Sequence, residues 1–156
     1  MQINITKMTA EHAKDVATWT YGGEYALYDN DEVVIDPHHF AFTDESGAFI
    51  GYMCFGADAR IPADEDGAYC DNYIDVGLHI KPEYTGRGMG AAFMQACLNF
   101  ARQQYNTNAF RATIAAFNKR AQALCASAGF SVEQEVTHAS TGKTFVIVKT
   151  ATHFSL

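Results

Sequence analysis

A glycine-rich segment, Thr85-Gly86-Arg87-Gly88-Met89-Gly90, constrains the fold more than any other part of the sequence. It lies between an apolar stretch that ends at Ile80 and a helix predicted from about Gly88 to Gln104, whose apolar residues recur at helical spacing. The first turn of a helix carries unpaired backbone N–H groups and a partial positive charge. Glycines let a phosphate approach that backbone without a Cβ in the way. The segment therefore predicts a phosphate-binding turn between a strand and a helix.

Three kinds of phosphate ligand can use such a turn, and the surrounding residues separate them. A Walker A loop ends in Gly-Lys-Ser/Thr, which is missing here. A dinucleotide fingerprint is nominally matched by Gly86, Gly88 and Ala91, but it should follow its strand directly and be followed by an acid for the ribose. A proline-containing connector intervenes, and no acid occurs from Tyr84 to Val132. Coenzyme A, with a pyrophosphate and a 3′-phosphate, needs no ribose acid, and Arg87 can add a charged contact.

The rest of the chain alternates strand and helix signals without a linker, which predicts one domain over residues 1–156. Alternating or apolar runs predict strands over 2–8, 39–43, 48–55, 69–80, 110–116, 130–136 and 144–148. Helices are predicted after the N-caps Thr9 and Asn118, in addition to the one that follows the glycine segment. Residues 19–36 are rich in aromatic and acidic side chains and are expected to be irregular or briefly helical. The fold class is therefore mixed α/β.

Charge is distributed unevenly along the chain, whose formal net charge is −7. From Gly22 to Asp75 there are 13 acidic residues and one basic residue, Arg60. This pattern is typical of a solvated acidic surface, or of an acidic half for a cationic ligand beside a basic half for a polyanionic cofactor. It disfavours nucleic acid as a partner, because phosphate neutralisation requires a basic face.

Targeting and metal-binding signals are missing from the sequence. The N-terminal residues do not form a signal peptide, and no apolar stretch approaches the ~20 residues that span a bilayer. We therefore expect a cytoplasmic protein that does not bind membranes. Cys54, Cys70, Cys97 and Cys125 form no Cys-x-x-Cys pair and have no His at zinc-ligand spacing. Reduced thiols and no metal are expected.

Two motifs together resemble the GNAT N-acetyltransferase superfamily. The family loop, Arg/Gln-x-x-Gly-x-Gly/Ala, is similar to Thr85–Gly90, with Thr85 departing from Arg/Gln. The second signature, Asn-x-x-Ala-x-x-Leu-Tyr-x-x-x-Gly-Phe, is similar to Asn118–Phe130, with Cys125 in place of the tyrosine. The resemblance covers essentially the whole chain in element order. It implies a central mixed, mostly antiparallel twisted sheet of about six or seven strands, flanked by about four helices.

The resemblance also implies that acetyl-CoA is the acyl donor and assigns its contacts. The strand before the loop would pair with the pantetheine arm, and one of its N–H groups would hold the thioester oxygen as negative charge develops. Asn118 would contact the cofactor arm, whereas its position alone predicts a helix N-cap. The residues implied for the pantetheine arm are Leu78, His79 and Ile80, and those for the pyrophosphate are Gly86, Arg87, Gly88, Met89, Gly90 and Ala91.

Three residues are candidates for proton transfer. Cys125 stands where the family has the tyrosine that protonates the leaving thiolate, and a thiol of pKa about 8.5 is a better acid than a phenol of about 10. The alternative is that Cys125 is a small core residue on an apolar helix face. Asp75 and His79 lie on one face of the predicted strand and are candidates for the base. They could instead pair with neighbouring groups, with water accepting the proton.

The acceptor is the least determined part of the reaction. Trp19, Tyr21, Glu24 and Tyr25 lie where the family places its acceptor-binding segment, and aromatic rings beside an acid suit a cationic amine. The same residues could simply pack a loop onto the sheet. The first hypothesis is an amine N-acetyltransferase; the others are a non-catalytic CoA-binding regulatory module, motivated by Cys125, and a dinucleotide-binding domain. The C-terminal hairpin could also pair with a second copy to form a homodimer.

Overall fold

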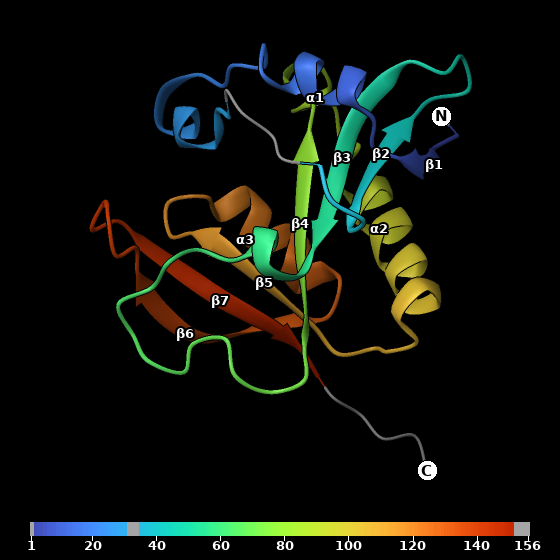
Figure 1. Cartoon of the computed structure of the whole chain (residues 1–156). Coiled ribbons are helices and arrows are strands. Elements are labelled where there is room, and N and C mark those ends of the chain that lie inside the picture. The colour runs from blue at the N-terminus through green and yellow to red at the C-terminus, as the bar shows by residue number, and fades with distance from the viewer. Residues whose placement is uncertain (1, 31–34, 152–156) are drawn as a thin grey trace. The chain divides into compact units, whose positions relative to one another are not determined.

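The computed structural model describes residues 2–30 and 35–151 (Figure 1). Seven strands follow one another in the sheet in the order β1-β2-β3-β4-β5-β7-β6. The strands and helices, with η for a 3-10 helix, are β1 (Asn4–Lys7), α1 (Ala10–Val16), η1 (Gly23–Tyr28), β2 (His39–Thr43), β3 (Phe49–Phe55), η2 (Gly56–Ala59), β4 (Ile74–Ile80), η3 (Pro82–Tyr84), α2 (Gly90–Tyr105), β5 (Phe110–Ala115), α3 (Lys119–Ser127), β6 (Phe130–Thr137) and β7 (Thr144–Thr150). The predicted mixed α/β class with a mostly antiparallel sheet is confirmed.

Two compact units divide the chain. The first comprises residues 1–54 and 78–93, and the second residues 55–77 and 94–156. Strand β4 contributes its last three residues to the first unit and its first four to the second. Among the described residues, no helix is both long and apolar enough to cross a membrane.

The first unit contains an antiparallel meander of β1, β2 and β3, with α1 after its first strand. Helix α1 begins with a capping box: Thr9 Oγ1 accepts from the His12 N–H at 3.3 Å, and His12 Nδ1 accepts from the Thr9 N–H at 3.1 Å. The apolar residues that this arrangement buries form a small core of Met8, Val16, Trp19 and Tyr52, with Tyr21 and Phe49 packed against it. The predicted N-cap at Thr9 is confirmed.

The end of β4 lies very close to β3 in this unit. Lys81 N–H donates to Ile50 O at 3.0 Å, and a Cβ on Gly51 would lie 2.7 Å from His79 O. Glycine at position 51 therefore permits the close backbone approach that holds the C-terminal end of β4 against β3.

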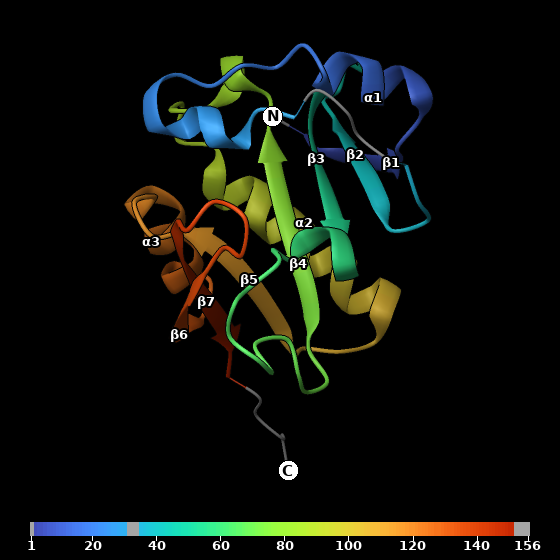
Figure 2. The ribbon, with the colours of Figure 1, turned by 60° about the vertical axis from the view of Figure 1, so that its left-hand side comes forward.

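The second unit contains the start of β4, then β5, β7 and β6 (Figure 2). Parallel pairing between β4 and β5 is limited to Ile74 with Phe110 and Asp75 with Arg111. The predicted hairpin of the last two strands is confirmed, with a bulge in β6 between Val132 and Gln134. Asn118 Oδ1 accepts from the Ala121 N–H at 3.1 Å, which confirms the predicted N-cap of α3.

One predicted strand begins later than expected. The pattern predicts a strand over 69–80, but β4 begins at Ile74. Asp71 has a φ of 75°, a left-handed conformation that a strand cannot contain, and Cys70 N–H donates back to Gly67 O in a turn. Tyr69 and Cys70 are instead held by side chains: the Tyr69 hydroxyl bonds Thr113 Oγ1, and Cys70 O accepts from Arg111. Alternation alone could not reveal these contacts.

Replacing Gly51 with alanine should destabilise the protein by about 1–3 kcal/mol, because the new methyl group would overlap the backbone of His79. The change is measured as the free energy of unfolding in urea. Gly22→Ala is the matched control, since a Cβ there meets nothing within 4 Å and its φ is −81°. Equal stability of the two alanine variants would contradict this account of the β3–β4 contact.

Candidate functional site

The glycine segment forms a loop between β4 and α2. After Ile80 the chain makes one 3-10 turn, η3, which is closed by Thr85: its N–H and its hydroxyl both donate to Pro82 O, at 3.1 and 2.6 Å. Gly86 and Gly88 then adopt left-handed φ values of 72° and 74°. Both positions require glycine for this path, which turns the backbone toward the start of α2.

The N–H groups of this loop have no internal partners. Within residues 2–30 and 35–151, none of the backbone N–H groups of residues 86–92 donates to an acceptor, and the first bond of the helix is Phe93 N–H to Met89 O at 3.1 Å. Residues 85–88 are also exposed. Seven successive free donors at the positive end of a 16-residue helix form a cradle for an anion.

Arg87 lies on the exposed side of this cradle. Its guanidinium carbon is 5.2 Å from the centre of the Tyr84 ring, and the side chain forms no ion pair with any described residue. The charge is therefore available to a phosphate, as the sequence predicts. The predicted contacts of residues 86–91 with a pyrophosphate fit this geometry and stay predictions.

The end of β4 is fixed by a tyrosine from the segment after α1. The Tyr21 hydroxyl donates to Ile80 O at 2.5 Å, and burial, with the nearby charge of Asp29, raises the pKa of Tyr21 to about 12. Ile80 O is therefore already occupied. The N–H and C=O groups of Leu78 and His79, both half-buried, lie beyond the two residues that pair with β5.

His79 lies against the ring of Tyr52. The ring centroids are 4.4 Å apart with an interplanar angle of 10°. Burial, and second the nearby charge of His39, lower the pKa of His79 to about 4. The imidazole is therefore neutral at pH 7 but a weak proton acceptor, far from the pKa that suits a general base. The assignment of His79 as the base stays a prediction, and its low pKa argues against that assignment.

Asp75 is enclosed by two arginines. Its Oδ1 accepts from Arg111 Nε at 2.6 Å, and its Oδ2 accepts from Arg111 Nη2 and from Arg60 Nε, both at 2.8 Å. Asp75 and Arg111 are both fully buried, and the hydrogen bonds that Arg111 donates to Asp75 raise the pKa of Arg111. The rings of Tyr69 and Tyr73 lie 5.1 and 5.8 Å from the guanidinium carbon of Arg111. This arrangement favours the alternative that Asp75 pairs with neighbouring groups rather than acting as the base. Its carboxylate anchors β4 to β5.

Cys125 is the one buried residue of α3. Burial raises the pKa of its thiol to about 11, which removes the advantage over a phenol that the free thiol would have. The alternative of a small core residue therefore fits the structure better than the general acid. All four cysteines are free thiols, as predicted.

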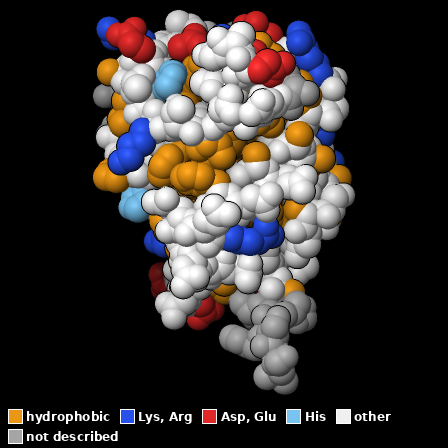
Figure 3. All heavy atoms as spheres, turned by 90° about the vertical axis from the view of Figure 1, so that its right-hand side faces the viewer, with side chains coloured by type: hydrophobic (Ala, Val, Ile, Leu, Met, Phe, Trp, Pro, Cys, Tyr) orange, Lys and Arg blue, Asp and Glu red, His pale blue; other side chains and the backbone are white. Residues whose placement is uncertain are grey.

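The residues predicted to bind the acceptor separate into two groups. Trp19 and Tyr21 lie in and against the core of the first unit, whereas Glu24 and Tyr25 belong to η1, where Glu24 is exposed. The face drawn in Figure 3 carries both acidic and basic side chains, and the predicted acidic half stays a prediction. The role of the four residues in binding an acceptor stays a prediction.

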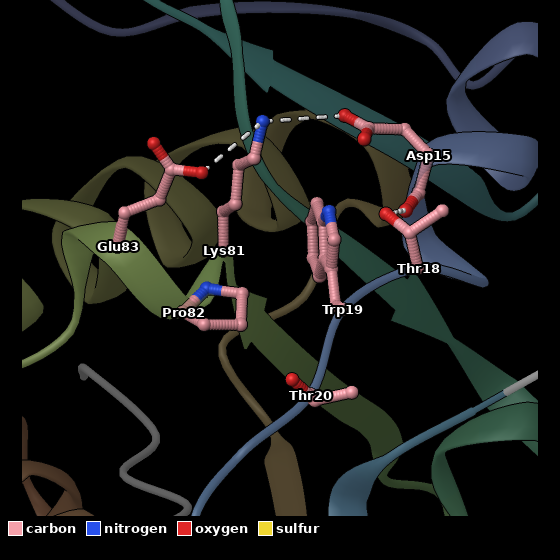
Figure 4. Close-up of a pocket in the computed structure, with 7 residues that line it drawn as sticks. All are labelled: Asp15, Thr18, Trp19, Thr20, Lys81, Pro82 and Glu83. Carbon is pink, nitrogen blue, oxygen red and sulfur yellow. Dashed lines mark hydrogen bonds and ion pairs between the residues drawn. The ribbon is translucent and has the colours of Figure 1, made fainter.

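A pocket that the sequence did not reveal lies beside Trp19 (Figure 4). Its volume is about 260 Å³. Lys81 Nζ lies between two carboxylates, 3.4 Å from Asp15 Oδ2 and 3.7 Å from Glu83 Oε1. Asp15 and Lys81 are 66 residues apart, so no local pattern could associate them. The pocket is lined by Asp15, Thr18, Trp19, Thr20, Lys81, Pro82 and Glu83.

Comparison with known proteins defines the class. A model of the acetyltransferase (GNAT) family matches residues 6–130. The chain therefore belongs to the GNAT acetyltransferase family, whose members take an acetyl group from acetyl-CoA. Among curated protein sequences, none matches the chain.

Solved structures show the same fold at low sequence identity. A chimera of the spermidine N-acetyltransferase SpeG from Vibrio cholerae with hSSAT is 13% identical, with a TM-score of 0.72 over 96% of this chain and 95% of that one. YncA from Salmonella typhimurium, solved with acetyl-CoA, is 17% identical, with a TM-score of 0.66 over 100% and 97%. A structure assigned to a phosphinothricin N-acetyltransferase is 13% identical, with a TM-score of 0.68 over 98% and 100%.

Asp75→Asn should destabilise the protein by about 3–5 kcal/mol, because it leaves the buried Arg111 guanidinium without its counter-charge. The free energy of unfolding in urea measures this loss. Arg60→Met is the control within the same cluster: its side chain is 39% exposed, and its loss should cost about 1 kcal/mol. A fully stable Asp75→Asn protein that has lost acetyl transfer would instead support the base assignment.

His79 should make the protein less stable in mild acid. The folded-state pKa of about 4 lies below the usual histidine value of 6.5, so between these two pH values the unfolded state binds a proton that the folded state does not. The free energy of unfolding should therefore fall by about 1–2 kcal/mol when the pH is lowered from 7 to 5, after allowance for the partial exposure of the His79 ring. Urea unfolding at several pH values should show a smaller fall in His79→Gln. The exposed His38→Gln is the control, and an equal fall in all three proteins would refute the assignment.

Proposed function

We propose that the chain transfers the acetyl group of acetyl-CoA to an amine, and that the loop of residues 86–91 binds the pyrophosphate. The observation that carries the proposal is the run of unpaired N–H groups at residues 86–92, which follows two left-handed glycines and opens a long helix. A pyrophosphate offers this run several oxygen acceptors at once. Arg87 adds a cation at the exposed edge.

The reaction proceeds by attack of the neutral amine nitrogen on the thioester carbonyl. A C–N bond forms, the C–S bond breaks, the thiolate of CoA leaves, and the nitrogen loses a proton. In this proposal a backbone N–H of the Leu78–Ile80 segment holds the oxygen while it carries negative charge. The positions of these groups at the end of β4, adjacent in sequence to the pyrophosphate loop, support that role.

The proposed acceptor is a cationic small molecule or a protein amine. Thirteen of the 18 acidic residues lie between Gly22 and Asp75, a stretch that contains Glu24 and Tyr25 and directly follows Tyr21. Such a charge balance attracts a protonated amine to the protein before the proton is lost. The structural neighbours are named for different acceptors, spermidine and phosphinothricin, so their shared fold does not choose between acceptors.

A CoA-binding regulatory module is the second candidate. The observation that favours it is Cys125, a buried thiol with a pKa of about 11 at the position of the family's proton-donating tyrosine. A module of this kind would bind acetyl-CoA on the same loop and release no thiol when amines are added.

The test combines binding and turnover. Gly88→Val should raise the Kd for acetyl-CoA at least about tenfold by calorimetry, because it forces a branched side chain onto a left-handed residue of the loop. Gly47→Val introduces the same strain at a φ of 86° in the β2–β3 turn and should leave the Kd unchanged. Unchanged binding in Gly88→Val would refute the loop site. Release of free CoA thiol over a panel of amines then measures transfer, and binding without release by any amine would favour the regulatory module.

A further inference from the structure

The pocket beside Trp19 contains a hydrogen-bond donor that nothing in the protein satisfies. Trp19 is 5% exposed, and its indole Nε1 is the buried side-chain nitrogen that has no hydrogen-bond partner among the described residues. In Figure 4 this nitrogen lies at the end of the ring nearest the tips of the Lys81 and Asp15 side chains. An unpaired buried donor costs free energy, so its persistence beside a pocket points to an acceptor atom supplied from outside the chain.

The charges around the pocket are only loosely paired. Lys81 Nζ stands 3.4 and 3.7 Å from the carboxylates of Asp15 and Glu83, whereas strong N⁺–H···O⁻ bonds are about 2.7–2.9 Å long. Two carboxylates therefore share one distant ammonium, and the three side chains carry one excess negative charge. This excess favours a cationic ligand and opposes an anion.

Volume limits the size of the ligand. The pocket of about 260 Å³ is smaller than the roughly 300–1,000 Å³ typical of sites for drug-sized molecules. We infer that this pocket binds a small cationic amine that also carries a neutral oxygen acceptor, with the ammonium against the two carboxylates and the oxygen on the indole N–H of Trp19. The inference does not depend on acetyl transfer, because it concerns binding to residues outside the glycine loop's N–H cradle.

Trp19 is the one tryptophan of the chain, so its fluorescence reports directly on this pocket. The full-length protein without acetyl-CoA is titrated with ethanolamine, and calorimetry is run in parallel. We expect a saturable fluorescence change with ethanolamine. Ethylamine, which lacks the oxygen, should bind about tenfold more weakly, because it leaves the indole N–H unpaired. Ethanol, which lacks the ammonium, and glycine, whose carboxylate would face two acids, should also bind more weakly.

Variants separate this site from nonspecific charge attraction. Asp15→Asn should weaken ethanolamine binding several-fold. Glu11→Gln is its matched control, since it removes the same charge from an exposed position of α1 outside the pocket lining and should leave binding unchanged. Lys81→Met should strengthen binding, because it removes the competing ammonium from the two carboxylates. Circular dichroism and a thermal melt verify the fold of each variant.

Several results would overturn the inference. If ethanolamine at tens of millimolar produced no fluorescence change and no heat, water alone would occupy the pocket. Equal affinity for ethylamine would rule out the contact between oxygen and indole. Tighter binding of glycine, or weaker ethanolamine binding in Lys81→Met, would reverse the proposed charge preference.

Discussion

The buried contact between Asp75 and Arg111 is the constraint on which the arrangement of β4 depends. Two fully buried charges are tolerated only when they are paired and hydrogen-bonded, and here a carboxylate on β4 accepts two bonds from the guanidinium on β5. The same residue pair is the second and last pairing between these strands. Strand β4 is thus anchored at its beginning to β5, while its end lies against β3 through Gly51. Strand β4 thereby contributes residues to both units, and the turn η3 connects its end to the glycine loop.

That loop shows how a short sequence produces a run of unpaired backbone donors, which is the proposed binding site. Thr85 closes the preceding turn with both its N–H and its hydroxyl, and the two left-handed glycines that follow direct the chain into α2. No side chain of the loop occupies its N–H groups, so the departure of Thr85 from the family's Arg/Gln removes no donor from the cradle. The threonine hydroxyl instead contributes to the geometry of the turn.

Much of this could be predicted from sequence because the signals are local. Periodicity and caps identify α1, α3 and the C-terminal hairpin, and the glycine spacing identifies the loop. The features that could not be predicted from the sequence depend on contacts between distant segments. Alternation extended β4 back to Tyr69, although Asp71 and the bonds of Cys70 turn the chain there. The same limit applies to the pocket, whose lining joins Asp15 to Lys81 across 66 residues.

The proton balance of the proposed reaction follows from what these long-range contacts do to the three candidate groups. Asp75 accepts three hydrogen bonds from arginines, His79 has a pKa of about 4, and Cys125 has a pKa of about 11. Near neutrality, the first is committed to an ion cluster, the second is a weak base, and the third is a weaker acid than a free thiol. Within the proposed function, the acceptor therefore reacts as the small neutral fraction of its own amine, and its proton passes to solvent. In this proposal the protein contributes by binding acetyl-CoA on backbone N–H groups and by stabilising the oxyanion, and neither contribution requires a titrating side chain.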